Sequence, residues 1–345
     1  MRVAMWYNNQ DVRVEELPVP KVGLGDILVR IEASGICGSD VMEWYRLSRA
    51  PLVLGHEIAG EIVEVGAGAK GFRVGDRVAA THHVPCYTCH HCRSGHHTMC
   101  DLLLKGTKFE PGGFAEYVLV PAINVEKGGV FHLPDEVSYE EGSFVEPLGC
   151  VLRGQRLARL SPGQSVLVVG AGISGLLHIN LARSLGAGRI IAVDSIGYRM
   201  DAALRLGADA VIEAREDVPS RLRELNGGLL ADLVIICRVP LVEQALASVE
   251  RGGTALFFGA AEEPGATIPT PINDILFRTE ITLTSTYGAA PSDCLTALEL
   301  IRTRRVQVLD MITQRLCLAD AVNGFRMASR PFEQQTLKII IEPQK

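Results

Sequence analysis

Several features are missing from this sequence, and each absence excludes a class of protein. No stretch of the 345-residue chain is apolar over the length that spans a membrane as a helix. Polar residues from Tyr7 onward follow the first residues at once, so the apolar core of a secretion signal is lacking. The formal net charge is −6, which provides no electrostatic footprint for nucleic acid. We therefore expect a cytoplasmic protein with no membrane and no nucleic-acid partner.

A disulfide framework is not expected either, although the chain has nine cysteines. Four of them crowd into residues 86–100, and the other five are scattered. In a cytosolic chain, such a tight cluster indicates a metal site rather than disulfides. Hydrophobic residues make up 47% of the chain and charged residues 21%, as in a globular protein with a sizeable core.

The secondary-structure pattern changes near residue 148, and this change predicts two domains in an α/β protein. The first part contains short β-type runs between glycine turns, at 12–17, 26–31, 57–65, 77–80 and 114–120. Strands and helices then alternate, with strands at 165–169, 189–193, 210–212, 232–236, 254–258 and 281–285, and helices at 174–185, 197–206, 218–226 and 242–249. This alternation predicts a parallel, doubly wound sheet over 148–287. A helix at 292–302 and a strand at 337–341 return the tail, 288–345, to the β-rich lobe of 1–147.

A glycine-rich turn joins the first strand and helix of the expected doubly wound domain. Gly170-Ala171-Gly172-Ile173-Ser174-Gly175 matches the pattern G-x-G-x-x-G directly after an apolar strand. The glycines provide a tight turn, close approach to a pyrophosphate and helix packing, and the helix N-terminus favours the negative charge. The alternative is a glycine turn that serves only packing.

An acidic residue ends the next expected strand. Asp194 follows Gly175 by 19 residues, the place where an acid holds the adenosine ribose hydroxyls of NAD rather than NADP. Arg199 lies five residues further and is expected to flank the adenine side. The alternative for Asp194 is a solvated acid at a strand end.

The cysteine cluster has the spacing of a zinc site. Cys86, Cys89, Cys92 and Cys100 supply four soft ligands at short intervals, and a closed shell of four thiolates is typical of structural zinc. Redox cysteines and an iron–sulfur cluster are the alternatives. We expect a zinc lobe over about 82–102, with His90, His91, His96 and His97 as solvated loop residues. His82 and His83 precede the cluster and could also approach an active site.

A second set of donors lies earlier in the chain. Cys37 follows an expected strand, and Gly55-His56-Glu57 follows Cys37 by 18 residues. A thiolate, an imidazole and a carboxylate with one open position are typical of catalytic zinc. Taken singly, Cys37 could be an inert buried thiol and His56 a core histidine. The two donor sets and the dinucleotide turn together favour the catalytic metal.

These motifs, in this order, resemble the zinc-containing medium-chain alcohol dehydrogenase family. The resemblance rests on the run from Gly55 to Gly66, on the cysteine lobe and on the turn at 170–175, and it covers essentially the whole chain. It implies a GroES-like catalytic domain, a Rossmann domain, two zinc ions per chain and an active site in the cleft between the domains. It also implies a homodimer or homotetramer.

Within that family, the chain resembles the sorbitol (polyol) and threonine dehydrogenase branch, because Glu146 stands in Val145-Glu146-Pro147-Leu148-Gly149. Alcohol dehydrogenases of the other type have a zinc-binding cysteine near this position. The resemblance implies that Glu146 is the third zinc ligand or holds a water on the metal, with Glu57 binding directly or as an exchanging partner. Cys150 is a weaker candidate, and a helix-start acid stabilised by the helix dipole is the alternative for Glu146.

One position departs from the family pattern. Family members often have a histidine five residues after the zinc cysteine, which passes the alcohol proton towards solvent. Met42 occupies that position here and cannot relay a proton. Ser39 is present and can take the first step. The path beyond it would run through the cofactor ribose, water, Glu57 or Glu146.

The resemblance implies oxidation of a secondary alcohol by hydride transfer to NAD, with zinc as the Lewis acid. The substrate is expected to be a polyol, a sugar or an amino alcohol, and the alternatives are a sugar phosphate or a hydroxy acid. Trp44, Tyr45 and Tyr287 are candidate pocket residues. Arg46 and Arg49 are expected to be solvated, the alternative being that they hold an anionic group. A zinc-free, quinone reductase-like or non-enzymatic nucleotide-binding protein is a further alternative that both cysteine motifs oppose.

Overall fold

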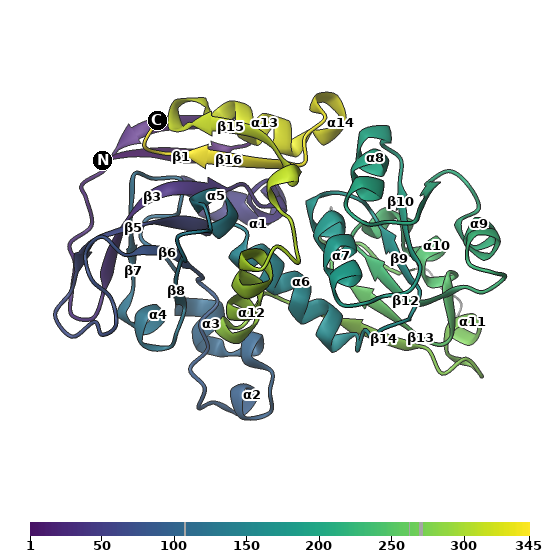
Figure 1. Cartoon of the computed structure of the whole chain (residues 1–345). Coiled ribbons are helices and arrows are strands. Elements are labelled where there is room, and N and C mark those ends of the chain that lie inside the picture. Colours follow the sequence, from purple (N-terminus) through teal and green to yellow (C-terminus); the bar gives the residue numbers. More distant parts are fainter. Residues whose placement is uncertain (107, 262, 269–271) are drawn as a thin grey trace. The chain divides into compact units, whose positions relative to one another are not determined.

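The computed structural model describes residues 1–106, 108–261, 263–268 and 272–345, and the chain forms two compact units (Figure 1). The first unit comprises Met1–Gly149, Gly288–Arg304 and Val308–Lys345. The second comprises Cys150–Tyr287 and Arg305–Gln307. In the described part of the chain, no helix is long and apolar enough to cross a membrane.

Two sheets form the first unit. The smaller has the order β2-β1-β4, from Asp11–Glu16, Arg2–Asn8 and Leu52–Val53. The larger has the order β15-β16-β3-β5-β6-β8, with β7 also paired to β3; its strands are Ile312–Cys317, Lys338–Glu342, Ile27–Gly35, Glu57–Val65, Arg77–Ala80, Val130–His132 and, for β7, Tyr117–Val120. Strand β16 pairs with β3, so the tail of the chain lies in the same sheet as the start.

The expected strands at 57–65 and 77–80 have the observed bounds, whereas β3 runs beyond residue 31 to Gly35. Strand β1 was not expected, because the start of the chain gave no clean alternation, yet it buries Val3, Ala4 and Trp6.

The helices of this unit are mostly short: α1 Glu43–Arg46, α2 His90–Arg93, α3 Asp101–Gly106, α4 Ala122–Glu126, α5 Tyr139–Gly142, α12 Pro291–Arg302, α13 Ala321–Ser329 and α14 Pro331–Gln334. Helix α6, Val145–Leu157, runs from the first unit into the second.

Strands β3 and β5 are antiparallel, and their register sets the position of the first donor set. Gly35 pairs with Glu57, so the residues just after β3 lie beside the start of β5. Gly60 allows this close pairing, since a Cβ atom there would lie 2.0 Å from the carbonyl oxygen of Arg30. Ile27, Ile31, Ile58 and Ile62 fill the core between these strands and hold the register.

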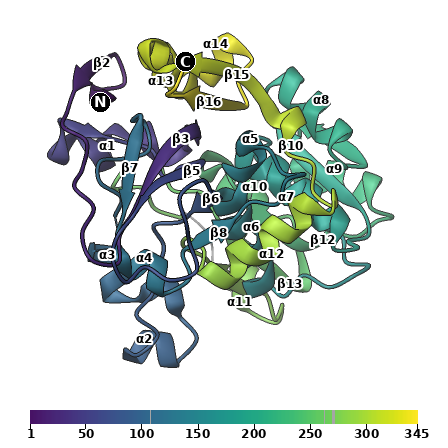
Figure 2. The same cartoon turned by 60° about the vertical axis from the view of Figure 1, so that its left-hand side comes forward.

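The second unit is a parallel six-stranded sheet of order β11-β10-β9-β12-β13-β14, which is the order of a Rossmann fold. Its strands are Ala210–Glu213, Ile190–Asp194, Val166–Val169, Ala231–Ile236, Val249–Phe257 and Thr282–Ser285. Its helices are α7 Ile173–Ser184, α8 Gly197–Arg205, α9 Val218–Leu225, α10 Val242–Leu246 and α11 Ile272–Leu276. Helix α7 contacts α8, and α9 contacts α10; the two pairs lie on opposite sides of the sheet in Figure 1, and Figure 2 shows the same unit turned by 60°. The expected doubly wound fold is confirmed.

One boundary in the second unit was predicted wrongly. The helix expected over 242–249 ends at Leu246, and β13 already begins at Val249. Val249 is β-branched and buried, and it pairs with Ala231 of β12. The apolar residues keep their helical spacing up to Val249, but pairing with β12 places this residue in a strand.

Candidate metal centres and cofactor turn

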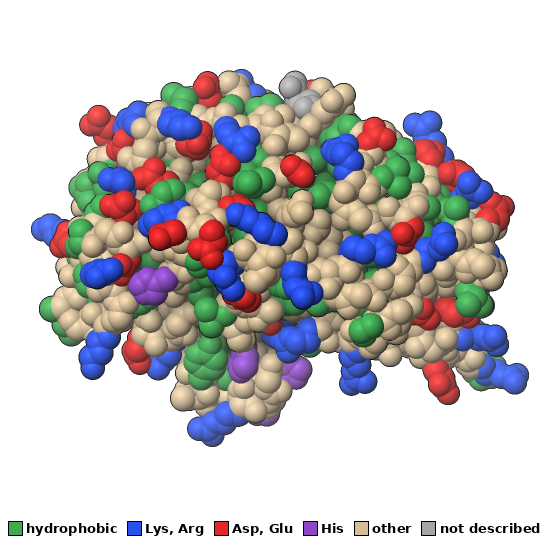
Figure 3. Space-filling view, in the orientation of Figure 1, with side chains coloured by type: hydrophobic (Ala, Val, Ile, Leu, Met, Phe, Trp, Pro, Cys, Tyr) green, Lys and Arg blue, Asp and Glu red, His purple; other side chains and the backbone are tan. Residues whose placement is uncertain are grey.

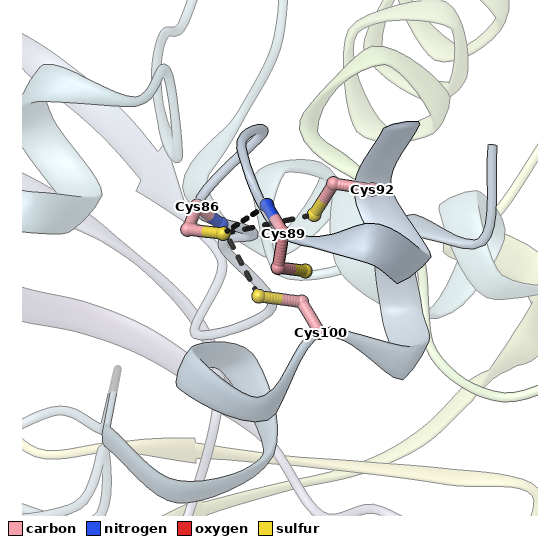
Figure 4. A group of neighbouring side chains, drawn as sticks. All are labelled: Cys86, Cys89, Cys92 and Cys100. Atoms are coloured by element: carbon pink, nitrogen blue, oxygen red, sulfur yellow. Dashed lines mark hydrogen bonds between the residues drawn. The ribbon is translucent and has the colours of Figure 1, made fainter. Parts of the chain in front are cut away.

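The four cysteines of the lobe point toward one another (Figure 4). Their sulfur atoms all lie within 4.8 Å of one another. The backbone N–H groups of Thr88 and Cys89 donate to Cys86 Sγ over 3.4 and 3.3 Å, and the N–H of Cys86 donates to Cys100 Sγ over 3.3 Å. These bonds stabilise thiolates, and the donor set fits a tetrahedral zinc with no open position.

Two cysteines of the lobe, Cys86 and Cys92, differ in their pKa. The Thr88 hydroxyl and nearby backbone N–H groups lower the pKa of Cys86 to about 5. Burial raises the pKa of Cys92 to about 12. One sulfur is therefore a ready thiolate, while the buried sulfur releases its proton when a cation binds.

The histidines within the lobe lie mostly at its surface. His90, His91 and His96 are exposed, and His97 is half-buried. His90 and His91 begin α2 rather than lying in a loop. Figure 3 shows histidine side chains at the surface over α2 and, elsewhere on this face, basic and acidic side chains intermingled.

The second donor set gathers at the junction of β3 and β5. Cys37 follows β3, His56 precedes β5, and Glu57 is the first residue of β5. One donor atom from each of the three lies within 4.8 Å of the others. The structure thus brings together residues that 18 positions separate in the sequence.

The carboxylate of Asp40 contacts both Cys37 and His56 and orients them. It accepts the backbone N–H of Cys37 over 3.0 Å, and its Oδ1 lies 3.5 Å from His56 Nδ1. Burial opposes the charge of Asp40, but His56, Arg46 and the Cys37 N–H together hold its pKa below the usual value. A carboxylate at Nδ1 leaves Nε2 of His56 for a metal, as is common for metal-binding histidines.

Glu57 has a buried cationic partner. Lys338 of β16 forms an ion pair with the Glu57 carboxylate, and the two side chains are 1% and 2% exposed. Lys338 also donates to the carbonyl oxygen of Ile36 over 3.1 Å, next to Cys37. Lys338 thereby offsets one of the negative charges among the metal donors.

Glu146, in the first turn of α6, belongs to a further group of donors with His82 and His83. Glu146 Oε1 lies 3.0 Å from His83 Nδ1, and the three residues have donor atoms within 4.8 Å of one another. The rings of His82 and His56 are 5.0 Å apart, so this group adjoins the Cys37 set. Burial, then His83 and His56, hold the pKa of His82 well below its usual value, which keeps the imidazole neutral.

Ser39 and Arg46 line the same site. Ser39 Oγ donates to Cys37 Sγ over 3.4 Å and accepts Arg46 Nη2–H over 3.2 Å. The expectation that Arg46 is solvated is wrong, because its side chain is only 14% exposed. Arg49, Trp44 and Tyr45 are exposed. Tyr287 follows β14 in the second unit and is also exposed.

In the second unit, the glycine turn leads from β9 into α7. A Cβ atom at Gly175 would lie 1.9 Å from the carbonyl oxygen of Gly170, so close contact requires the third glycine, and a φ of +97° favours glycine at position 170. At Gly172, the N-cap of α7, a Cβ atom would meet only Arg199 at 3.7 Å. This open space above a helix N-terminus fits a pyrophosphate, whose charge the exposed N–H groups favour. Ile173 and Ser174 form the first turn of α7.

Asp194 ends β10 beside this turn. Its carboxylate accepts the backbone N–H groups of Ala171, Ser195 and Ile196 over 2.7–3.0 Å. Arg199 Nη1 lies 4.0 Å from Asp194 Oδ2, and the Arg199 side chain is 14% exposed. A carboxylate has about four acceptor sites, so these bonds leave capacity for a ribose hydroxyl.

Two elements of the site escaped the sequence reading. Asp40 stands in Ser39-Asp40, three residues after Cys37, but a single acid near a cysteine carries no specific signal. Lys338 gave a stronger one, because a lysine inside the apolar strand Lys338–Glu342 must have a buried partner.

Two family models match this chain. The model described as "Alcohol dehydrogenase GroES-like domain" matches residues 23–135, and "Zinc-binding dehydrogenase" matches residues 174–303. The chain belongs to the zinc-containing medium-chain alcohol dehydrogenases, in their polyol branch. It is a zinc-dependent oxidoreductase of this family that acts on CH–OH donors with NAD(P), and it has the GroES-like and Rossmann folds of the family.

Three relatives of this alcohol dehydrogenase illustrate the match. The "Probable D-xylulose reductase A" of Neosartorya fischeri is 34% identical, covering 91% of this chain and 90% of the relative. The "Sorbitol dehydrogenase" of Bacillus subtilis is 29% identical over 100% of this chain and 98% of the relative. The crystal structure of a zinc-binding dehydrogenase from Sinorhizobium meliloti bound to NADP is 27% identical, has a TM-score of 0.86 and covers 99% of both chains.

Proposed function

We propose that this enzyme oxidises a secondary alcohol of a polyol, sugar or amino alcohol to a ketone with NAD, and that it catalyses the reverse reaction. The supporting observation is the half-buried donor pair of Cys37 and His56, oriented by Asp40, in a chain that also has a dinucleotide turn. This donor set has the composition of a catalytic zinc site, with a position left for substrate.

The third donor is a carboxylate. Glu57 has an oxygen within reach of Cys37 and His56, whereas Glu146 lies with His82 and His83. This geometry favours Glu57 as the direct third ligand and Glu146 as the group that holds water or hydroxyl at the open position. Zinc bound there supplies Lewis acidity to the hydroxyl oxygen of the substrate, and the nicotinamide accepts the hydride. Because Lys338 offsets the charge of Glu57, the donors leave more of the metal's positive charge for the substrate.

The proton of the alcohol leaves through Ser39. Its Oγ lies beside Cys37 Sγ and is a hydrogen-bond acceptor as well as a donor. Met42 offers no further proton acceptor, and the Arg46 guanidinium cannot be deprotonated. The onward path therefore runs through the cofactor ribose, water, or Glu146.

Two further assignments concern the cofactors. The four-cysteine lobe is proposed to hold a structural zinc, which gives two zinc ions per chain. Asp194 supports NAD over NADP, because its carboxylate repels a 2′-phosphate and accepts ribose hydroxyls. Arg199, beside Asp194 and Gly172, is proposed to flank the adenosine side of the site.

We propose that one structural unit is the catalytic domain and the other is the NAD-binding domain. Residues 1–147 and 288–345 would form the GroES-like catalytic domain, and 148–287 the NAD-binding domain, with a small-molecule alcohol as the partner. We propose a homodimer or a homotetramer. The free cysteines of the described chain suit a reducing compartment such as the cytoplasm.

The test is NADH formation by the purified, zinc-loaded protein on a panel of polyols, sugars, sugar phosphates and L-threonine, with NADP alongside. Metal analysis of the same sample gives the zinc content per chain. A rate with NAD on one substrate class supports the proposal and identifies that class. Full zinc loading without turnover on any member would reject it.

A further inference from the structure

Arg46 is a largely covered cation beside the metal donors, with 14% of its side chain exposed. Its Nε donates to the carbonyl oxygen of Ser39 over 3.0 Å, and its Nη2 donates to Ser39 Oγ over 3.2 Å. Ser39 Oγ in turn contacts Cys37 Sγ. One serine hydroxyl therefore separates the guanidinium from the metal-binding thiolate. Burying a guanidinium is costly unless its charge is used, and this position is held by two fixed hydrogen bonds.

The guanidinium keeps donors to spare. Arginine has five N–H groups in a planar fork, and the bonds to Ser39 use only Nε and Nη2. Within the described residues, no hydrogen bond of Nη1 to a protein acceptor is found. The Tyr45 ring covers one face of the group at 4.7 Å, which leaves an edge open to a ligand. With 14% of the side chain exposed, that edge can be reached.

The negative charge of Asp40 is shared rather than given to Arg46 alone. Asp40 Oδ1 lies 3.7 Å from Arg46 Nη2 and 3.5 Å from His56 Nδ1, and Oδ2 accepts the N–H of Cys37. Burial and the other histidines are the larger causes that lower the pKa of His82. Arg46 and Lys108, which come from different segments, lower it further. Asp40 therefore offsets the charge of Arg46 only in part.

Resting on the proposed function, we propose that Arg46 is a specificity-determining residue that binds an oxyanion, a carboxylate or a phosphate, carried by the alcohol substrate. The planar fork matches such a group with two parallel hydrogen bonds. Because Arg46 lies so close to Cys37, the oxyanion and the reacting hydroxyl belong to the same small molecule. The preferred substrate class is an anionic polyol, such as an aldonate or a polyol phosphate, rather than a neutral one.

The test compares substrates that differ at one end only: a neutral hexitol, the corresponding aldonate and the hexitol phosphate, each with zinc-loaded enzyme and NAD. We expect kcat/KM to be at least about tenfold higher for one anionic substrate, since charge-assisted bonds of this kind are each worth about one power of ten or more. Whether the aldonate or the phosphate is preferred identifies the oxyanion.

Arg46→Gln should abolish this preference by raising KM for the anionic substrate. Because Arg46 also anchors Ser39, the variant is expected to lower kcat on both substrates, and only the ratio of the anionic to the neutral substrate reports anion binding. Arg46→Lys should restore part of the ratio. Arg49→Gln is the matched control: Arg49 packs on the same Tyr45 ring at 4.9 Å but is exposed, so its ratio should stay unchanged.

Turnover of the neutral hexitol with no anionic preference would overturn the inference and leave the proposed function standing. An anionic preference that persists in Arg46→Gln would also overturn it, because another group would then bind the oxyanion. If no substrate turns over, the proposed function fails, and the Arg46 site is judged by binding of inorganic phosphate and the aldonate in calorimetry. Equal binding to wild type and Arg46→Gln would reject the site, and a loss of about tenfold or more would support it.

Discussion

The cysteine lobe and the Cys37 site offer metals two different surroundings within one unit. The sulfur atoms of the lobe accept hydrogen bonds from the lobe's own backbone, at Cys86, Thr88 and Cys89. The Cys37 site instead has charged side chains around it: Asp40 from the turn just after Cys37, and Glu146 and Lys338 from distant segments. A structural site needs a closed shell of ligands, whereas a catalytic site must control the charge around an open position.

The largest effect is expected where the two sites differ most, in catalysis. Cys37→Ser should lower kcat/KM about a thousandfold or more, since loss of Lewis-acid stabilisation costs roughly 4 kcal/mol in the transition state. Metal analysis should show about one zinc fewer per chain, while NAD binding, followed by fluorescence, remains. Unchanged turnover would show that this thiolate is not part of the active site.

Lys338→Met tests the countercharge of the Cys37 site. Removing one partner of a buried ion pair leaves the other charge uncompensated, so unfolding free energy should fall by about 3–5 kcal/mol. Chemical denaturation measures the loss. The double variant with Glu57→Gln should recover part of it because no lone charge is then buried. A single variant as stable as wild type would contradict this role of Lys338.

Cys92→Ser tests the lobe. The variant should lose the structural zinc and unfold at a temperature lower by more than about 4 °C, which corresponds to more than 1 kcal/mol. Cys317→Ser, at a cysteine outside the lobe, serves as the control in calorimetry. If Cys92→Ser retained its full zinc content and its unfolding temperature, the lobe would not be a zinc site.

Asp40→Asn tests the orientation of His56, a feature without a counterpart in the lobe. A partner of a metal-binding histidine typically contributes about 10–100-fold to metal affinity. Competition with a chelator should therefore release the catalytic metal at a chelator concentration lower by that factor, and leave the lobe metal in place. Simultaneous release of both metals would argue that the two sites are one cooperative unit.

The smallest effect extends the comparison to a buried histidine that has no carboxylate. Burial lowers the pKa of His178 to about 3, from its usual 6.5, and Gln155 is its hydrogen-bond partner. The unfolded chain gains a proton below about pH 6.5 that the folded chain refuses until about pH 3, so stability falls as the pH falls through this window. At pH 5 this difference in pKa lowers the free energy of unfolding by about 2 kcal/mol relative to neutral pH.

His178→Leu should remove this pH dependence. The measurement is denaturant unfolding of both proteins between pH 5 and 8, and the difference between their unfolding free energies should change with pH in the stated direction. A difference that stays constant over this range would mean that folding does not shift the pKa of His178.

The comparison of the two sites also explains what the sequence could predict. The lobe and the glycine turn are local: their donors and glycines lie within a few residues, and their spacing alone indicates their chemistry. Strand β16 shows the limit of local patterns, because the strand itself was expected but the ion pair of Lys338 with Glu57 spans 281 residues. Only the sheet order, with β16 beside β3, brings that pair together.

Arg46 shows a second limit. Its position nine residues after Cys37 gave no indication of burial, and an arginine in such a polar segment is usually solvated. Its position depends on the turn at 38–40, where the Ser39 carbonyl and hydroxyl both face the guanidinium. Side-chain hydrogen bonds of this kind depend on backbone geometry that residue types do not encode by themselves.

The three backbone hydrogen bonds to Asp194 have a consequence for the affinity of coenzyme binding. The bond from Ala171 ties the glycine turn after β9 to the end of β10 before any ligand arrives, and the bonds from Ser195 and Ile196 fix the backbone that follows β10. The conformational entropy of this loop is therefore lost during folding rather than during association. The dinucleotide meets a rigid cradle, so its affinity is not reduced by a loop that must first become ordered.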